Sequence, residues 1–331
     1  MTKHVAEVDT AATVKPKTAT SGSTIPRSHL IGFAVIFVAI VLAPQFLYPV
    51  FVMKVLCFAL FACAFNLLLG FTGLLSFGHA AFFGSAGYAA GHAAKVWGLS
   101  PELSILFAML VSAVLGALMG SVAIRRSGIY FALIVLAFAQ MVYFFVLQSP
   151  LTGGEDGLQG IPRNMLFGLF DISADRSFYW LVAVVFAVGF LSIYRVVHSP
   201  FGEVLKGIRE NEPRMISLGY QVNQYKFVTF VLSAALSGMA GGTKALVFML
   251  ASLVDSHWTM SGEVVLMTLV GGMGTVFGPI VGAAVIVTMQ NYLASFGSLV
   301  LIVQGLVFVI CVMAFREGII GVLAKWLKLK L

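Results

Sequence analysis

Apolar runs of about 20 residues recur along this sequence from Leu30 to roughly residue 315, and no polar stretch between them is long enough for a soluble domain. A helix needs about 20 apolar residues to cross the hydrocarbon core of a bilayer. The composition agrees, because 60% of the 331 residues are apolar and 10% are charged, whereas a soluble domain is roughly half apolar and about a quarter charged. The sequence therefore predicts an all-α, polytopic membrane bundle in contact with lipid.

The apolar runs predict about ten transmembrane spans, with a range of eight to ten. The stretch 260–294 sets this range, because several glycines and Pro279 interrupt it. It can form one bent span with a re-entrant piece, or two short spans. The candidate spans are residues 30–50, 54–74, 79–97, 103–124, 128–148, 178–197, 227–250, 260–276, 278–294 and 298–315.

The basic residues favour one orientation of these spans. With both termini in the cytoplasm, fifteen of the 20 lysines and arginines lie in cytoplasmic segments, four lie outside and Lys244 lies within a span, which is the excess that cytoplasmic loops show. Residues 1–29 are polar, without apolar periodicity, and are expected to form a disordered cytoplasmic tail. The first apolar run is too long for a cleaved signal peptide. We expect a membrane domain over 30–318 and a basic cytoplasmic C-terminus over 319–331.

The sequence does not support several other classes of protein. The basic residues flank apolar spans, as membrane topology requires, so the net charge of +7 does not indicate nucleic-acid binding. The three cysteines lie inside apolar runs and are interpreted as small buried side chains. The histidines are scattered, and neither a metal-ligand set nor a nucleophile with a base is present. We therefore predict no metal site and no enzymatic activity.

A long polar connection, residues 195–226, interrupts the spans on the cytoplasmic side. Ser199 and Pro200 are typical of a helix N-terminus, and Gly219 is typical of a helix end. Between them lies an apolar stripe, broken near Pro213, which nothing within the connection can bury. The stripe consists of Val204, Leu205, Ile208, Met215, Ile216 and Leu218.

Two interpretations of this connection stay open. It can lie on the bilayer surface as an amphipathic segment, or it can dock onto a soluble partner. A surface-lying helix carries a mostly basic polar face, whereas here Glu203, Glu210 and Glu212 are mixed among the bases. The mixed charge favours a protein groove over anionic lipid.

Three blocks of sequence resemble the permeases of ABC importers, and specifically the branched-chain amino acid permeases of the LivM type. In chain order they read GFTGLLSFGHAAFFGSAGYAAG (70–91), SPFGEVLKGIRENEPRMISLGYQVNQYKFVTFVLSAALSGMAGG (199–242) and GGMGTVFGPIVGA (271–283). The resemblance covers about residues 30–318 and leaves the polar tail outside.

The resemblance implies a heteromeric importer in the bacterial inner membrane. Two related permease subunits would form the pathway, two ABC ATPase subunits would lie beneath them, and a periplasmic binding protein would deliver the substrate. Residues 199–219 would seat in a groove on an ATPase subunit, and we call them the coupling segment. The resemblance assigns this role to Ser199, Pro200, Gly202, Glu203, Ile208, Arg209, Glu212 and Gly219.

The chain itself carries no ATPase signature. It has no G-x-x-x-x-G-K-[ST] phosphate loop, and the nearest string, GGTK at 241–244, lacks the spacing and the final hydroxyl. ATP and Mg²⁺ would therefore be bound by the partner subunits, and we predict no cofactor in this chain.

Glycines gather in two stretches, 70–78 and 271–279, and predict broken helices there. Such breaks are tolerated at membrane depth only where they face protein or a water-filled cavity. With span 54–74 running inward and span 227–250 running outward, the two halves would form an inverted repeat around a central site. The glycines concerned are Gly70, Gly73, Gly78, Gly271, Gly272, Gly274 and Gly278.

Polar side chains inside the predicted spans are candidates for the transport pathway, because ionisable groups at depth are costly and tend to face a cavity. His79, Lys244 and Glu263 are the sharpest candidates, with Asn66 and Ser76 in addition. Other interpretations stay open. His79 can lie at a helix end near the headgroups, Glu263 can lie near the outer interface, and Lys244 can snorkel outward.

The sequence thus predicts a permease subunit that moves leucine, isoleucine and valine, or related small solutes, with energy from separate ATPases. Similar permeases carry urea, amides or aromatic acids, and no residue here chooses among these substrates. A transporter driven by an ion gradient is the rival from another class. It would need membrane carboxylates, for which Glu263 is the one candidate in the predicted spans, and it would have no use for the coupling segment.

Overall fold

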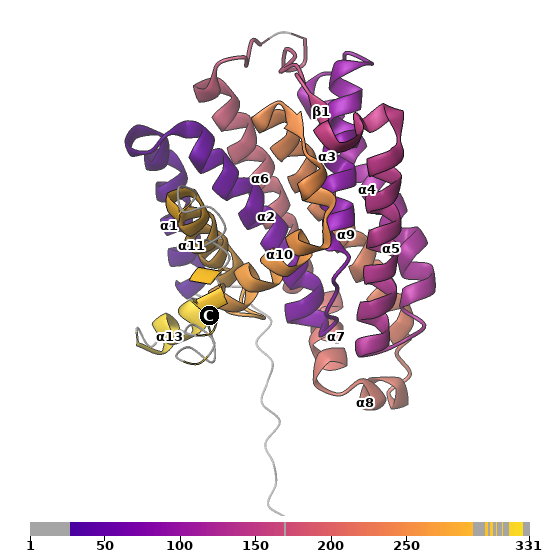
Figure 1. Cartoon of the computed structure of the whole chain (residues 1–331). Coiled ribbons are helices and arrows are strands. Elements are labelled where there is room, and N and C mark those ends of the chain that lie inside the picture. The colour runs from indigo at the N-terminus through magenta and orange to yellow at the C-terminus, as the bar shows by residue number, and fades with distance from the viewer. Residues whose placement is uncertain are drawn as a thin grey trace, which may run out of the picture.

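The computed structural model describes residues 27–168, 170–293 and 318–326, together with a few residues between 302 and 313. Its helices pack side by side into one bundle, which confirms the predicted polytopic, all-α membrane fold (Figure 1). Six of the described helices are long and apolar enough to cross a membrane. They are α1 (Arg27–Phe46), α2 (Pro49–Thr72), α4 (Pro101–Ala123), α5 (Ile129–Gln148), α6 (Asp175–Val197) and α9 (Val222–Phe248).

Shorter helices complete the bundle. In the ambiguous stretch 260–294 the chain forms two of them, α10 and α11, rather than one bent span. Most of the predicted span 298–315 and most of the predicted tail 1–29 lie outside the described residues. The shorter helices are α3 (His79–Lys95), α7 (Pro200–Glu210), α8 (Glu212–Ser217), α10 (Trp258–Gly271), α11 (Gly278–Leu293) and α13 (Gly318–Trp326).

The centre of the bundle is formed by α2 and α9. Every residue from 56 to 72 is buried, and so is every residue from 233 to 243; a helix that is apolar and buried all round belongs inside a bundle. Glycines let these helices approach closely, since a side chain at Gly241 would collide with the carbonyl group of Phe83. The outer helix α4 instead exposes an apolar stripe at every fourth residue, as a lipid-facing helix does. It consists of Leu106, Leu110, Val114, Leu118 and Val122.

Both central helices are followed by a break. Behind α2, Gly73 takes a left-handed φ of 78°, and residues 73–78 return into the bundle to reach α3. Behind α9, Met249 takes a φ of 53°, and residues 249–257 return into the bundle to reach α10. This second break contains the short strand β2 (Leu250–Ala251) and the 3₁₀ turn η3 (Leu253–Ser256).

The first turns of α3 and α10 meet inside the bundle, where the backbone amide of Ala80 donates a hydrogen bond to the hydroxyl of Ser261 over 2.9 Å. Helices α2 and α9 run in opposite directions, as the predicted inverted repeat would require. A further break, which the sequence analysis did not predict, follows α9. It is 249–257, whereas the glycine-rich stretch 271–279 forms the turn between α10 and α11. No glycine occurs in 249–257, so the sequence pattern pointed elsewhere.

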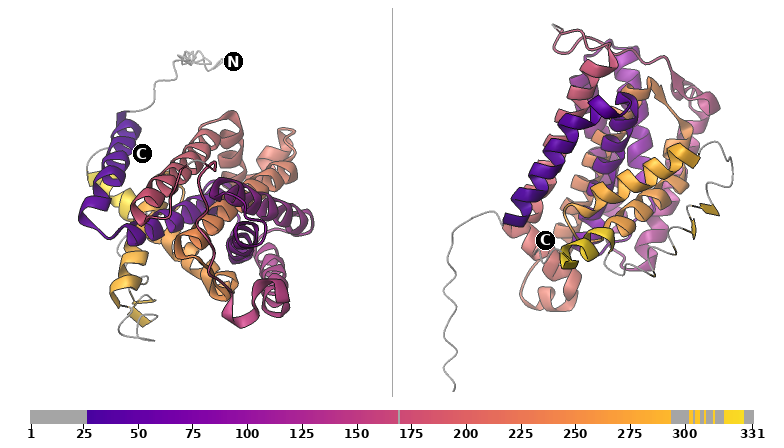
Figure 2. Two further views of the ribbon diagram at one scale, coloured as in Figure 1. Left: turned by 90° about the horizontal axis from the view of Figure 1, so that it is seen from above. Right: turned by 90° about the vertical axis from the view of Figure 1, so that its left-hand side faces the viewer.

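The two ends of the bundle differ in character. One end carries α7 and α8, the beginning of α1 and α13 (Figure 2); there the ring of His29 lies 5.1 Å from that of His198. The opposite end is covered by the connection 149–174, whose strand β1 (Leu158–Gln159) pairs with β2. Arg163 ties this cover to the start of α6 through an ion pair of 2.6 Å with Asp175.

Candidate functional site

The coupling segment forms two short helices that protrude from one end of the bundle (Figure 1). Helix α7 begins at Pro200 behind Ser199, whose side-chain oxygen accepts a hydrogen bond from the amide of Gly202. Helix α8 begins behind Asn211, which caps the amide of Arg214 over 3.0 Å. Each helix therefore has an N-cap of the usual kind, and the Asn211 cap is a signal that our sequence analysis passed over.

The apolar stripe of the coupling segment is divided between two surroundings. On α7, Leu205 and Ile208 are buried against the bundle, with 0% and 3% of their surface exposed. At the end of α8, Ile216 and Leu218 stay 57% and 63% exposed. The bundle thus covers the inner half of the stripe, whereas the described residues leave the outer half exposed.

Charged residues of the coupling segment fall into two groups. Glu212 forms an ion pair of 2.6 Å with Lys226, which is 5% exposed, so it holds α8 to the start of α9. Glu203 pairs with Lys206 on the surface, where such a pair adds little stability. Gly219, with a φ of 88°, ends the segment in the left-handed conformation that favours glycine.

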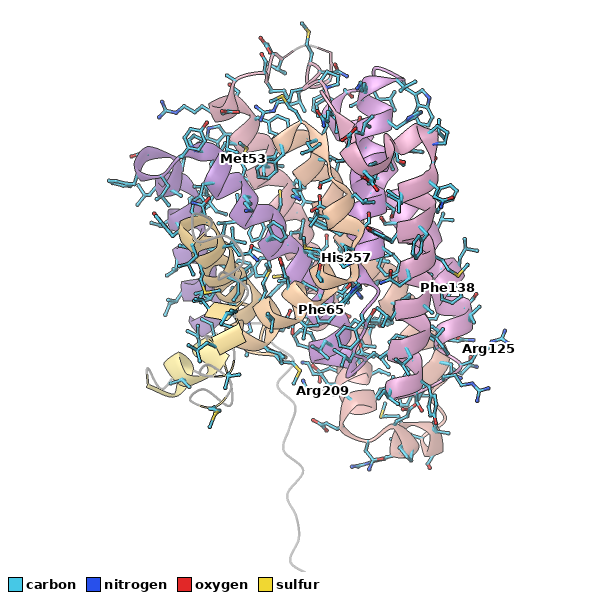
Figure 3. All side chains as sticks on the ribbon, viewed as in Figure 1. Met53, Phe65, Arg125, Phe138, Arg209 and His257 are labelled. Carbon is cyan, nitrogen blue, oxygen red and sulfur yellow. The ribbon has the colours of Figure 1, made fainter. Side chains whose placement is uncertain are left out.

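Arg209 turns back from α7 toward the bundle, where its guanidinium donates to the carbonyl oxygen of Gly70 in α2. Figure 3 shows Arg209 below Phe65, toward the end of the bundle that carries α7. One helical turn earlier in α2, the amide of Asn66 binds the α10–α11 turn twice. It accepts from the Gly274 amide over 3.0 Å and donates to the Thr275 carbonyl over 2.8 Å.

His79 and Ser76 form a polar node inside the bundle. The hydroxyl of Ser233 donates to the carbonyl of Ala64 over 2.6 Å, so it accepts from Nε2–H of His79 over 2.8 Å. The other nitrogen, Nδ1, then accepts from the hydroxyl of Ser76 over 2.9 Å. His79 is 0% exposed. Both ring nitrogens therefore have a hydrogen-bond partner, and the imidazole presents no free polar atom to a cavity.

A second polar cluster lies nearer the opposite end of the bundle. Lys244 of α9 forms an ion pair with Asp255 in the second break, and the two side chains are 14% and 9% exposed. Lys54 and Glu263 lie close enough to act on each other electrostatically. Lys244 is thus paired inside the protein. Sequence reasoning missed Asp255, because it falls between two predicted spans.

One face of α10 is left uncovered by the residues that the structure describes. Thr259 is exposed, Gly262 has no atom within 4 Å of the position that a side chain would take, and Glu263 is partly exposed. His257 lies just before this helix, at about mid-height of the bundle (Figure 3), with its ring 5.2 Å from that of Tyr143. Sequence analysis pointed to Glu263 but missed its open neighbours.

Within the described residues, no group of three or more His, Cys, Asp or Glu side chains is placed to hold a metal ion. Cys57 and Cys63 are free and buried. Cys311 lies outside the described residues.

Comparison with known proteins agrees with the fold. The high-affinity branched-chain amino acid transport system permease protein LivM of Salmonella typhimurium is 28% identical over 288 residues, covering 80% of this chain and 68% of that protein. The probable branched-chain amino acid transport permease protein LivH of Methanocaldococcus jannaschii is 24% identical over 261 residues, 71% of this chain and 79% of that protein. The ribose import permease protein RbsC of Bacillus subtilis is 27% identical over 201 residues, 55% of this chain and 59% of that protein. No solved structure matches significantly.

A family model covers most of the chain. It matches residues 50–312, which include both breaks, the coupling segment and the α10–α11 turn. The chain therefore belongs to the family of branched-chain amino acid transport system permease components.

Proposed function

We propose that this chain is one permease subunit of an ATP-driven importer that moves branched-chain amino acids, or closely related small solutes, across the bacterial inner membrane. The observation that carries the proposal is the protruding pair α7–α8 on a chain of this family. A membrane domain driven by ATP needs a rigid element that reaches a soluble motor. The chain has no phosphate loop of its own, so the motor is a separate subunit.

The outer surface of the coupling segment suits an ATPase subunit. Ile216 and Leu218 supply exposed apolar area at the tip, and the surrounding side chains include both acids and bases, such as Glu210 and Arg214. An apolar centre with a mixed polar rim is typical of protein interfaces. Because the α7 end carries basic residues of the coupling segment, among them Lys206 and Arg214, we assign this end to the cytoplasm.

The open face of α10 supports a second permease subunit. Thr259 and Glu263 are polar, and α10 lies within the bundle of membrane-spanning helices. Polar groups at membrane depth face a bundle interior or an aqueous cavity rather than lipid. We therefore place the transport pathway along this face, closed by a related permease, and give His79 a structural role because it is fully buried.

The substrate assignment rests on the relatives. LivM is named for branched-chain amino acids, whereas RbsC, a relative over a shorter stretch, is named for ribose. A periplasmic binding protein that delivers the solute would set much of the specificity. We therefore propose leucine, isoleucine and valine as substrates, with urea, amides and aromatic acids as the alternatives.

Reconstitution tests this proposal. The chain is co-expressed with its neighbouring permease, ATPase and binding-protein genes, and the complex is placed in proteoliposomes. We expect leucine uptake that requires both ATP on the ATPase side and the binding protein on the other. Omitting either component is the control. Uptake that a proton or sodium gradient drives without ATP would contradict the proposal and favour a secondary transporter.

A further inference from the structure

We infer that Arg209 is a positioning residue that links the coupling segment to both halves of the membrane domain, rather than a residue that binds the ATPase. This inference rests on the proposed function, because it takes α7–α8 to be the element that the motor moves. Arg209 lies near the end of α7, and its guanidinium reaches the Gly70 carbonyl of α2.

The Arg209 side chain lies between two glycines from distant parts of the chain. Gly73 follows α2 and Gly274 lies in the α10–α11 turn, and their φ values are 78° and 79°. A Cβ atom at Gly73 would lie 3.3 Å from Cγ of Arg209, and a Cβ atom at Gly274 would lie 2.6 Å from its Nη1. The left-handed backbone and the missing side chains together make room for the guanidinium.

The C-terminal end of α2 attracts the guanidinium of Arg209. Helix α2 ends at Thr72, so the carbonyl of Gly70 belongs to its last turn, where carbonyl groups have no partner within the helix. The negative end of the helix dipole also favours a cation. Arg209 therefore supplies both a hydrogen bond and a charge at this end.

Asn66 extends the link to the second half. It is 2% exposed and holds both Gly274 and Thr275 from inside the bundle. Asn66 and Gly70 are one helical turn apart on α2, so α7 and the α10–α11 turn attach to neighbouring points of one helix. A displacement of α7 is thereby applied to α2 and to the start of α11 together.

The test compares uptake with ATP hydrolysis in the reconstituted complex. For Arg209→Ala we expect normal co-purification of the ATPase subunits and continued hydrolysis, but a fall of roughly tenfold or more in solute moved per ATP, within the range of known coupling effects. Arg126→Ala is the matched control, because Arg126 is an exposed arginine between α4 and α5, outside the coupling segment. That variant should keep the wild-type ratio.

Two outcomes overturn the inference. One is an unchanged ratio of uptake to hydrolysis in Arg209→Ala, and the other is loss of the ATPase subunits from that variant, which would make Arg209 a docking residue. A wild-type complex that holds no ATPase would instead contradict the proposed function.

The variant Arg209→Lys can still donate to a single carbonyl and should recover much of the coupling. A lysine variant as impaired as the alanine variant counts against the Gly70 contact.

Hydrogen exchange provides a readout that does not depend on transport. In the Arg209→Ala complex we expect faster exchange at the amides of 272–277, which are distant from position 209 in sequence. The connection 149–174 at the opposite end of the bundle should be unaffected. Unchanged exchange in the α10–α11 turn would show that Arg209 does not hold it.

Discussion

Lys244 and Asp255 show how single charged residues are accommodated within this bundle. Each is almost enclosed, and each has the other as its ion-pair partner. Removing one partner from a buried pair leaves an uncompensated charge, which costs more than removing both. The pair therefore joins the second break to α9, and its loss should lower the free energy of unfolding.

Lys244→Met tests this role. We expect it to lower the free energy of unfolding by about 3 kcal/mol or more, measured as a lower unfolding temperature of the purified chain in detergent. The double variant Lys244→Met/Asp255→Leu is the control and should regain most of the loss. A double variant no more stable than the single one would show that the pair is not coupled.

His79 permits a separate test of structure against transport. Replacing it with Ala removes one hydrogen-bond partner from each of the hydroxyls of Ser76 and Ser233, which should cost about 1–3 kcal/mol. Transport per correctly assembled complex should stay near the wild-type value, because His79 is fully buried. A normal unfolding temperature combined with lost uptake would instead place His79 in the pathway.

At the scale of helices and turns, local signals predicted some boundaries and missed others. Ser199 and Pro200 correctly predicted the start of α7, because a cap and a proline act within one turn of helix. The second break was missed, because 249–257 contains no glycine and its path depends on contacts with distant helices. Asn66 was predicted as a candidate for the transport pathway, not as a residue that holds the α10–α11 turn. Its partner Gly274 lies 208 positions away, and a single sequence does not reveal such a pairing.

The tip of α8 provides a prediction about the coupling segment. Ile216→Glu places a charge in the exposed apolar patch, and we expect it to weaken binding of the ATPase subunit roughly tenfold or more, as for a central interface residue. Ser217→Glu adds the same charge at the neighbouring position and should weaken binding much less. The measurement is ATPase binding to the immobilised permease. If both variants lose the same amount of ATPase binding, the added negative charge explains the loss and the apolar patch does not.

At the scale of the whole molecule, one face of α10 is open among the described residues, which place no atom within 4 Å of a side chain at Gly262. A cysteine at this position would meet lipid on an isolated chain but water if a second permease closes a pathway there. Thiolate forms readily only in water. Gly262→Cys should therefore react faster with a water-soluble thiosulfonate in the complete complex than in the chain alone, in a background where Cys311 is replaced by serine.

Leu118→Cys is the matched control for this labelling, because Leu118 lies in the exposed apolar stripe of α4 and should meet lipid in both preparations. Its reaction should stay slow with and without the second permease. Cys57 and Cys63 are buried and should stay unreactive as well. Equal rates at position 262 in the two preparations would place the pathway on another face of the bundle. A rise at 262 but not at 118 would locate the aqueous space along α10, between the two permeases.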